Sequence, residues 1–235
     1  MNPKILRNRF LLLLPVLIAV LATSASAAVI RVKWDSPTNG PGSTWSNAYN
    51  TVTAAIAAST SNDEIWVAGN NANPYIENIT LKAGVGLYGG FAGTETTRTQ
   101  RNWNTNVTIL NGNGADLVVT APSGATTTTV LDGFEITGAF TGINCTSSSP
   151  SITNNIISGN DVDGIYCETS SPKITNNTIS GNLQSGIYCL SGSPTITNNN
   201  ISGNQSGISC DSVAASPSIT NNIISENTYE GIFCY

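Results

Sequence analysis

The chain has 235 residues, of which 10% are charged, and it contains no histidine. Three of its nine basic residues and none of its fourteen acidic residues lie in positions 1–27, so residues 28–235 carry a net charge of −8. Binding to a phosphate backbone needs clustered Lys and Arg, and only Lys173 lies beyond Arg101. We therefore expect no nucleic-acid partner, and a highly acidic polysaccharide is disfavoured unless a cation bridges the charges.

The first 27 residues have the pattern of a secretory signal peptide. Basic residues at Lys4, Arg7 and Arg9 precede an apolar segment from Phe10 to Leu21, and Ala25-Ser26-Ala27 is a small-residue cleavage site. The apolar segment has twelve residues, which is short of the roughly 20 that span a bilayer, so cleavage is favoured over an uncleaved anchor. We expect an exported protein, secreted or held at the cell surface, with no transmembrane span after cleavage.

Residues 28–141 are irregular and are predicted to form an N-terminal cap followed by the first coils of a larger array. The alanine-rich run from Val52 to Ala58 predicts a short helix, which would cover the open strand edges of the first coil. Short apolar bursts bounded by turn residues predict strands. They lie at Glu64–Val67, Ile76–Leu81, Gly86–Tyr88, Val107–Leu110, Leu117–Thr120 and Val130–Thr137.

Residues 142–235 repeat one phrase four times and begin it a fifth time. The copies are Gly142–Asp163, Gly164–Ser185, Gly186–Ser206 and Gly207–Glu230, followed by residues 231–235. Each contains G-I-x-C, then S-P-x-I-T-N-N-x-I-S and a second turn. A fixed period near 22 residues indicates a solenoid. The apolar residues of each copy form three short bursts between turn signals, which predicts three short strands per coil and an all-β parallel β-helix.

Stacking of the copies aligns equivalent residues into columns. Ordering one coil costs roughly 1–2 kcal/mol per residue, more than its few buried side chains return, so a coil is stable only between neighbours. The inward columns are Ile143/Ile165/Ile187/Ile208/Ile232, Cys145/Cys167/Cys189/Cys210/Cys234, Ile152/Ile174/Ile196/Ile219 and Ile157/Ile179/Ile201/Ile224. The asparagines Asn155/Asn177/Asn199/Asn222 and Asn160/Asn182/Asn204/Asn227 are predicted to form hydrogen-bonded ladders and to tolerate the left-handed backbone at the corners.

The phrases I-T-N-N-x-I-S-G-N and G-I-x-C resemble the repeats of right-handed parallel β-helix proteins secreted by bacteria, whose architecture is that of the pectate-lyase-like proteins. The resemblance covers roughly the last 40% of the chain and is specific for fold rather than for activity. It implies the right-handed sense, which the spacing alone does not show.

Four further blocks resemble the start of large bacterial secreted or surface β-helix proteins. They are Ser43–Tyr49, Glu64–Ala68, Leu87–Glu95 and Arg101–Trp103. This resemblance implies a cell-surface or secreted module, usually without enzymatic activity. The sequence departs from such proteins at Tyr235, one strand into a new coil, where a capping unit is expected. We favour a fragment of a longer reading frame, and the alternative is end-to-end self-association through the open coil.

The column of five cysteines allows three interpretations. In-register neighbours lie within disulfide range, and an exported protein meets oxidants, but parallel Cβ vectors suit a disulfide poorly. We favour buried free thiols that pack as small hydrophobic groups. A soft-metal site is suggested by resemblance to β-helix families that include periplasmic copper-processing proteins, but the only methionine is Met1 and histidine is absent. We therefore predict neither a metal site nor a cofactor.

Candidate catalytic carboxylates are sparse in the repeats. Polysaccharide lyases and hydrolases on this architecture need clustered or paired acids. Asp161 and Asp163 share a corner, but Leu183 and Gln184 fill the next copy of that corner. With Asp132 and Glu135 they are the weak catalytic candidates, and we favour solvated turn residues as their role.

Aromatic residues share one outward column, which contains Tyr166, Tyr188 and Phe233. Aromatic faces above a polar sheet can stack on sugar rings, and in-register aromatics also stack on one another. The outward Thr153/Thr175/Thr197/Thr220 column raises an ice-binding hypothesis, which we disfavour because the residues two positions earlier vary.

The sequence therefore predicts an exported β-helix module with a structural or adhesive role that contacts carbohydrate or other surface material. The alternative is a polysaccharide lyase or glycoside hydrolase of the pectate-lyase-like type.

Overall fold

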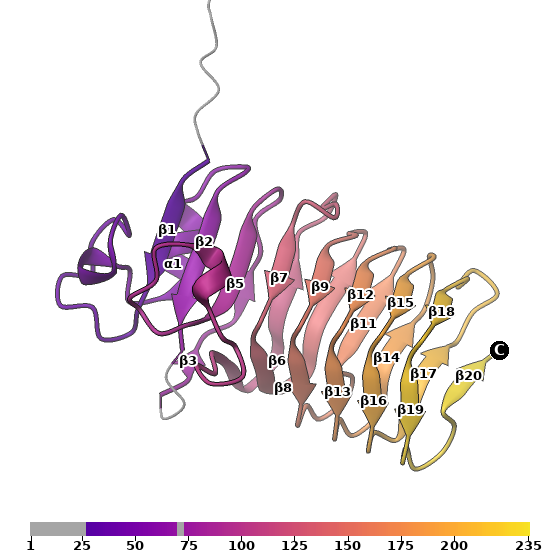
Figure 1. The fold of residues 1–235 in the computed structure, drawn as a ribbon. Helices are drawn as coiled ribbons and strands as arrows, with labels where there is room; N and C mark the ends of the chain where they lie inside the picture. The colour runs from indigo at the N-terminus through magenta and orange to yellow at the C-terminus, as the bar shows by residue number, and fades with distance from the viewer. Residues whose placement is uncertain (1–26, 70–72) are drawn as a thin grey trace, which may run out of the picture.

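The computed structural model describes residues 27–69 and 73–235 and is a parallel β-helix whose coils stack along one axis (Figure 1). Positions 1–26, which hold most of the predicted signal peptide, lie outside the described residues. In the described part, an eight-stranded sheet and a twelve-stranded sheet enclose a common core. The all-β solenoid predicted from the repeat is confirmed.

The eight-stranded sheet, called sheet A, takes one strand from each coil. Its strands in spatial order are β1 (Val29–Val32), β2 (Glu64–Ala68), β5 (Gly86–Phe91), β7 (Val130–Asp132), β9 (Ser151–Thr153), β12 (Lys173–Thr175), β15 (Thr195–Thr197) and β18 (Ser218–Thr220). Neighbouring strands pair in parallel, with each isoleucine of the repeats opposite its equivalent in the next coil.

The twelve-stranded sheet, called sheet B, contains the other strands. Its strands are β3 (Tyr75–Ile76), β4 (Ile79–Thr80), β6 (Ile109–Ala121), β8 (Glu135–Thr146), β10 (Ile156–Ser158), β11 (Ile165–Glu168), β13 (Thr178–Ser180), β14 (Ser185–Cys189), β16 (Asn200–Ser202), β17 (Ser206–Cys210), β19 (Ile223–Ser225) and β20 (Ile232–Cys234). The first coil has α1 (Val52–Ala58) and no strand in this sheet, the coils of β5 and β7 have one long strand each, and the remaining coils have two short strands each. The long strands β6 and β8 turn a corner without a break, and β8 also crosses the expected boundary at residues 141 and 142.

The core consists of the inward columns that the repeat defines. Ile143, Ile165 and Ile187 are fully buried and aligned in register, as are the cysteines two positions later. In the last described coil, by contrast, Ile232 is 47% exposed. One continuous apolar core therefore runs from the N-terminal coils through the regular repeats.

The sharp corner after each of the last four sheet A strands, β9, β12, β15 and β18, is made by two asparagines with different roles. The first, such as Asn176 (φ 58°), takes the left-handed backbone, and the second, such as Asn177, is buried. The side-chain Nδ2 of Asn177 donates to the Ile152 carbonyl at 3.0 Å and to Asn199 Oδ1 at 3.0 Å. The left-handed position therefore falls on the residue before the ladder and not on the ladder asparagines as expected. At the next corner of this coil, Gly181 (φ 64°) does the same.

The last rung of this asparagine ladder, Asn222, differs from the rungs before it. Its Oδ1 accepts hydrogen bonds from the backbone N–H of Asn199 at 2.8 Å and from Asn199 Nδ2 at 3.0 Å, and its own Nδ2 donates to the Ile196 carbonyl at 2.9 Å. Asn155, Asn177 and Asn199 are at most 2% exposed, whereas Asn222 is only half-buried. The cause is that β18 is the edge strand of sheet A, so no further described strand of that sheet stacks on this corner. Asn222 therefore belongs to the hydrogen-bonded ladder, and among the described residues it is bonded on one side only.

The predicted helix α1 (Val52–Ala58) forms at the N-terminal end. Thr51 caps it, and the carboxylate of Glu77 accepts hydrogen bonds from the backbone N–H groups of Val52 and Thr53 at 2.8 Å each, which suits the positive end of a helix. Val52 and Ala55 pack into the core. The outer edge of β1 is covered differently from expectation, because backbone groups of residues 42 and 49 hydrogen-bond to it.

Several strand boundaries differ from the sequence prediction. β1 was not predicted, and the predicted strands at 107–110 and 117–120 are parts of the single strand β6. The predicted strand at 130–137 is divided into β7 and β8 at Gly133, whose φ of 84° turns the chain. In the part of the chain that the structure describes, no helix has the length and apolar character to cross a bilayer.

Candidate functional site

The four N-terminal sequence blocks meet on the outer face of sheet A. Register aligns Arg31 with Trp66, Trp66 with Tyr88, and Tyr88 with Asp132, so these side chains form one outward column. Residues 92–106, here called the crossing loop, contain the 3-10 helix η2 (Arg98–Gln100). In Figure 1 this magenta segment passes in front of β2 and β5. The loop brings further arginine and tryptophan side chains onto the column.

A bulge in β5 lets the crossing loop approach the sheet closely. The register between β2 and β5 shifts after Trp66, and Gly90 has a φ of 89°. A Cβ atom on Gly90 would lie 2.7 Å from the backbone N and Cα of Trp103. The backbone N–H of Asn102 donates to the Gly90 carbonyl at 2.8 Å. Glycine at this position therefore allows both the bulge and the close approach of the loop.

Arg101 fastens the loop to the sheet through a buried ion pair. Its Nη2 lies 2.7 Å from Asp132 Oδ2, and the side chains are 8% and 10% exposed. Its Nη1 donates to the carbonyls of Gly89 and Asp132 at 3.1 Å each, and Asn154 Nδ2 donates to Asp132 Oδ1 at 3.0 Å. Because both charges are hydrogen-bonded from several sides, removing either one would leave a buried unpaired charge. Asp132 thus has a structural partner.

Arg98 forms a second, more exposed pair on the same face. Its guanidinium lies 4.4 Å from the centroid of the Tyr88 ring and is paired with Glu64. Glu64 Oε2 also accepts a hydrogen bond from Trp66 Nε1 at 2.8 Å. Burial raises the pKa of Tyr88, so its hydroxyl stays protonated at neutral pH.

A small aromatic core supports the face from the N-terminal side. The rings of Trp66 and Phe91 are stacked, with centroids 4.8 Å apart, and Trp45 packs on Phe91 at 5.7 Å. Arg31 lies over both tryptophans. Trp45 Nε1 donates to the Glu95 carbonyl at 2.9 Å, which ties the first block to the crossing loop. We call the eight side chains Arg31, Trp45, Trp66, Tyr88, Phe91, Arg98, Arg101 and Trp103 the arginine–aromatic cluster.

The cluster borders a surface hollow of about 290 Å³ that is lined by Arg98, Thr99, Arg101 and Trp103. Trp103 is half-buried, and the Arg101 guanidinium covers it at 4.8 Å from the ring centroid. A second hollow, of about 310 Å³, lies over β4 and β6 and is lined by small polar and aliphatic residues and by Asp116. The first hollow is the one that combines an aromatic ring with several hydrogen-bond donors.

The predicted sugar-contact residues are only partly brought together. Tyr166 and Tyr188 stack with centroids 5.6 Å apart and an interplanar angle of 8°. Register places Ser209 between Tyr188 and Phe233, and Ser209 is 8% exposed, so no open slot separates the last two rings. The Tyr188 hydroxyl donates to Asp211 Oδ2 at 3.0 Å. Tyr166 and Tyr188 therefore stack on each other, as in-register aromatic residues do, and Phe233 is not part of this stack.

The four candidate catalytic carboxyls lie on different parts of the coil. Asp132 faces outward from sheet A, whereas Glu135 pairs in sheet B opposite Ile156. Asp161 is exposed at a corner. Asp163 is buried, accepts a hydrogen bond from the Ser185 N–H at 3.0 Å, and has its pKa raised by burial to about 6. The structure does not gather these carboxyls into one site.

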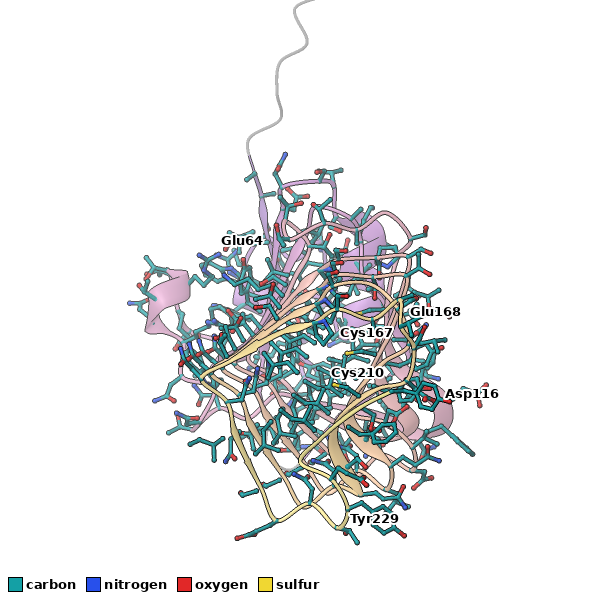
Figure 2. All side chains as sticks on the ribbon, turned by 90° about the vertical axis from the view of Figure 1, so that its right-hand side faces the viewer. Glu64, Asp116, Cys167, Glu168, Cys210 and Tyr229 are labelled. Atoms are coloured by element: carbon teal, nitrogen blue, oxygen red, sulfur yellow. The ribbon has the colours of Figure 1, made fainter. Side chains whose placement is uncertain are left out.

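The cysteine column lies inside the coil, where Figure 2 shows Cys167 and Cys210 while Glu168 points outward. All five cysteines are free thiols, and Cys234 is exposed. The hydrogen bond with the preceding thiol, together with burial, raises the pKa of Cys167 and of Cys189. Raised pKa values favour the thiol over the thiolate that binds metals. Among the described residues, no group of three or more His, Cys, Asp or Glu side chains is placed to hold a metal ion.

The stacked parallel coils define a β-helix repeat protein. A family model described as a right handed beta helix region matches residues 98–235, which is more than half of the chain, and the chain belongs to this family. The match supports the right-handed sense that the sequence implied only by resemblance. A search of curated proteins and a search of solved structures found no match. Because the fold serves many functions, the function of this chain depends on its particular side chains.

Sequence reasoning did not select Tyr88, Arg98, Arg101 or Trp103 as site residues. The available signal was the density of aromatic residues in the four blocks, together with the arginines, since three of the six basic residues of positions 28–235 belong to the cluster and two of these three lie between the blocks or before them. That signal did not indicate which residues contact one another, because the blocks are separated by irregular connections.

Proposed function

We propose that this chain is an exported bacterial β-helix module with a structural or adhesive role, secreted or held at the cell surface, that contacts carbohydrate without cleaving it. The leader pattern of positions 1–27 supports export. The β-helix fold is consistent with a structural or carbohydrate-contacting role. The resemblance of the repeats and of the N-terminal blocks supports the bacterial and extracellular assignment.

The observation that carries the carbohydrate assignment is the hollow beside Trp103. Sugar sites combine an accessible aromatic ring with a few polar groups that fix orientation. Trp103 is half-buried, and Arg98 and Thr99 present donors at the same hollow.

The placement of the carboxylates favours binding over cleavage. Glycosidases hold two carboxyl groups about 5–9.5 Å apart. On the face that carries the hollow, Glu64 and Asp132 lie two strands and two residues apart. Both carboxylates are engaged by arginine. The lyase or hydrolase alternative therefore lacks a free acid pair on this face.

Two measurements test the proposal. Expression of the full chain in a bacterial host, followed by fractionation and N-terminal sequencing, should give an exported protein that begins at or near Ala28. The exported protein should then be retained by at least one polysaccharide without releasing reducing or unsaturated ends. A chain that stays in the cytoplasm contradicts export, and release of ends would establish the enzyme alternative.

A further inference from the structure

Some of the hydrogen-bond donors at the hollow are not engaged by other groups of the protein. Arg101 is 8% exposed, and its guanidinium is bonded to the Asp132 carboxylate and to the backbone carbonyls of Gly89 and Asp132. Arg98 is 43% exposed and is held by Glu64 through Nη1, which leaves other N–H groups directed to solvent. Thr99 is exposed, and its hydroxyl lies 3.2 Å from that of Thr97. Arg98 and Thr99 can therefore donate to a ligand that lies on the Trp103 ring.

The charge of the hollow favours an uncharged ligand. Each guanidinium has its own carboxylate, since Arg98 pairs with Glu64 and Arg101 with Asp132. The residues around the hollow therefore supply no excess positive charge, and residues 28–235 carry −8 in total. An anionic ligand would gain little local attraction and would meet the unfavourable field of the whole chain, whereas paired guanidiniums still donate to hydroxyl groups.

A column of threonine side chains leads away from the hollow along the solenoid. In this column the Thr175 hydroxyl oxygen is buried, and the hydroxyls of Thr197 and Thr220 lie 3.0 Å apart. Register aligns Asp132 with Thr153 and then with the next three threonines of sheet A, here called the threonine track: Thr153, Thr175, Thr197 and Thr220. At a strand spacing of about 4.8 Å, the track extends about 19 Å beyond Asp132. Figure 1 shows β9, β12, β15 and β18 facing the viewer with no other segment crossing them.

We propose that the hollow binds one sugar residue of a neutral, extended polysaccharide and that the polymer continues along the threonine track. This inference rests on the proposed carbohydrate contact and specifies its place and ligand class. The ring of Trp103 supports the apolar face of the sugar, and Arg98 and Thr99 donate to its hydroxyl groups. The track follows one line of register partners along the solenoid, so an extended, ribbon-like β-linked chain can follow it and a coiled chain cannot.

Three sets of variants separate binding from folding. Thr99→Glu places a carboxylate beside Arg98 and Arg101 and occupies their donors, and the position is exposed, so the fold should be retained. Trp103→Ala removes the ring, whereas Trp103→Phe keeps an aromatic surface and should recover part of the binding. The matched control is Tyr166→Ala with Tyr188→Ala, which removes the other aromatic surface. Circular dichroism and a thermal midpoint should accompany each variant.

Binding is measured by affinity electrophoresis of the purified chain in gels that contain hydroxyethylcellulose, dextran or polygalacturonate. The expected result is retardation by hydroxyethylcellulose alone, reduced at least tenfold by Thr99→Glu and by Trp103→Ala and unchanged in the tyrosine control. Equal or stronger retardation by polygalacturonate overturns the neutral ligand, and equal retardation by dextran overturns the extended one.

The same gels separate failure of this inference from failure of the proposed function. Retardation that is insensitive to Thr99→Glu but lost in the tyrosine control overturns the hollow as the site and leaves carbohydrate contact in place. If none of the three polymers retards the wild-type chain, the neutral extended ligand is overturned, and a wider polysaccharide panel with no retention would overturn the proposed function as well.

Discussion

Replacing Asp163 by asparagine should stabilise the protein at neutral pH. Asp163 is 5% exposed, and burial is the main cause that raises its pKa from 3.8 to about 6. The folded protein therefore holds a proton at Asp163 that the unfolded chain releases above pH 4. The stability contributed by this proton is complete below about pH 4, falls as pH rises to about 6, and is absent above that value.

The magnitude follows from the size of the shift. A difference of roughly two pKa units corresponds to about 3 kcal/mol of differential stability. Asparagine resembles the protonated carboxyl in shape, keeps an acceptor for the Ser185 N–H and does not titrate. The Asp163→Asn chain should therefore match the wild type below pH 4 and exceed it by up to about 3 kcal/mol above pH 6.

The assay is urea unfolding followed by circular dichroism at intervals from pH 4 to pH 8. Asp161→Asn is the matched control, because Asp161 occupies the same corner and is exposed. The control should change the free energy of unfolding by less than about 0.5 kcal/mol at every pH. A difference between Asp163→Asn and wild type that does not vary with pH would show that the carboxyl is not held protonated by burial.

Three further substitutions test the sheet A face and the ladder. Arg101→Met leaves its carboxylate partner buried and unpaired, and should lower the free energy of unfolding by about 3–5 kcal/mol in a urea titration; a loss below 1 kcal/mol would contradict the buried pair. Gly90→Ala forces the crossing loop away from the bulge and should lower the free energy of unfolding by about 1–3 kcal/mol, measured by thermal unfolding. Gly124→Ala, whose added Cβ meets nothing within 4 Å, should lower it less in the same assay. Asn177→Ala leaves several buried donors and acceptors without partners and should cost at least about 2 kcal/mol, more than Asn222→Ala at the half-buried end rung; unchanged unfolding would mean that the ladder contributes little.

The sequence by itself determined the regular part of the molecule. A 22-residue period with three apolar bursts fixes the number of strands per coil and the residues that face inward, because stacked copies place identical residues side by side. Local signals also located α1 at Val52–Ala58, since an alanine-rich run has a high helix propensity. These features depend on short-range propensity and on repetition, both of which can be read from one chain.

Only the tertiary structure decided which irregular residues meet. Arg101 and Asp132 are 31 residues apart in the chain, and neither belongs to the repeat that would have indicated a partner. Their contact depends on the bulge at Gly90, which sets the path of the crossing loop over sheet A. The candidate site arises from this path. An outward side chain of an irregular coil has no counterpart in a repeated copy, so the sequence does not indicate which side chains will lie beside it.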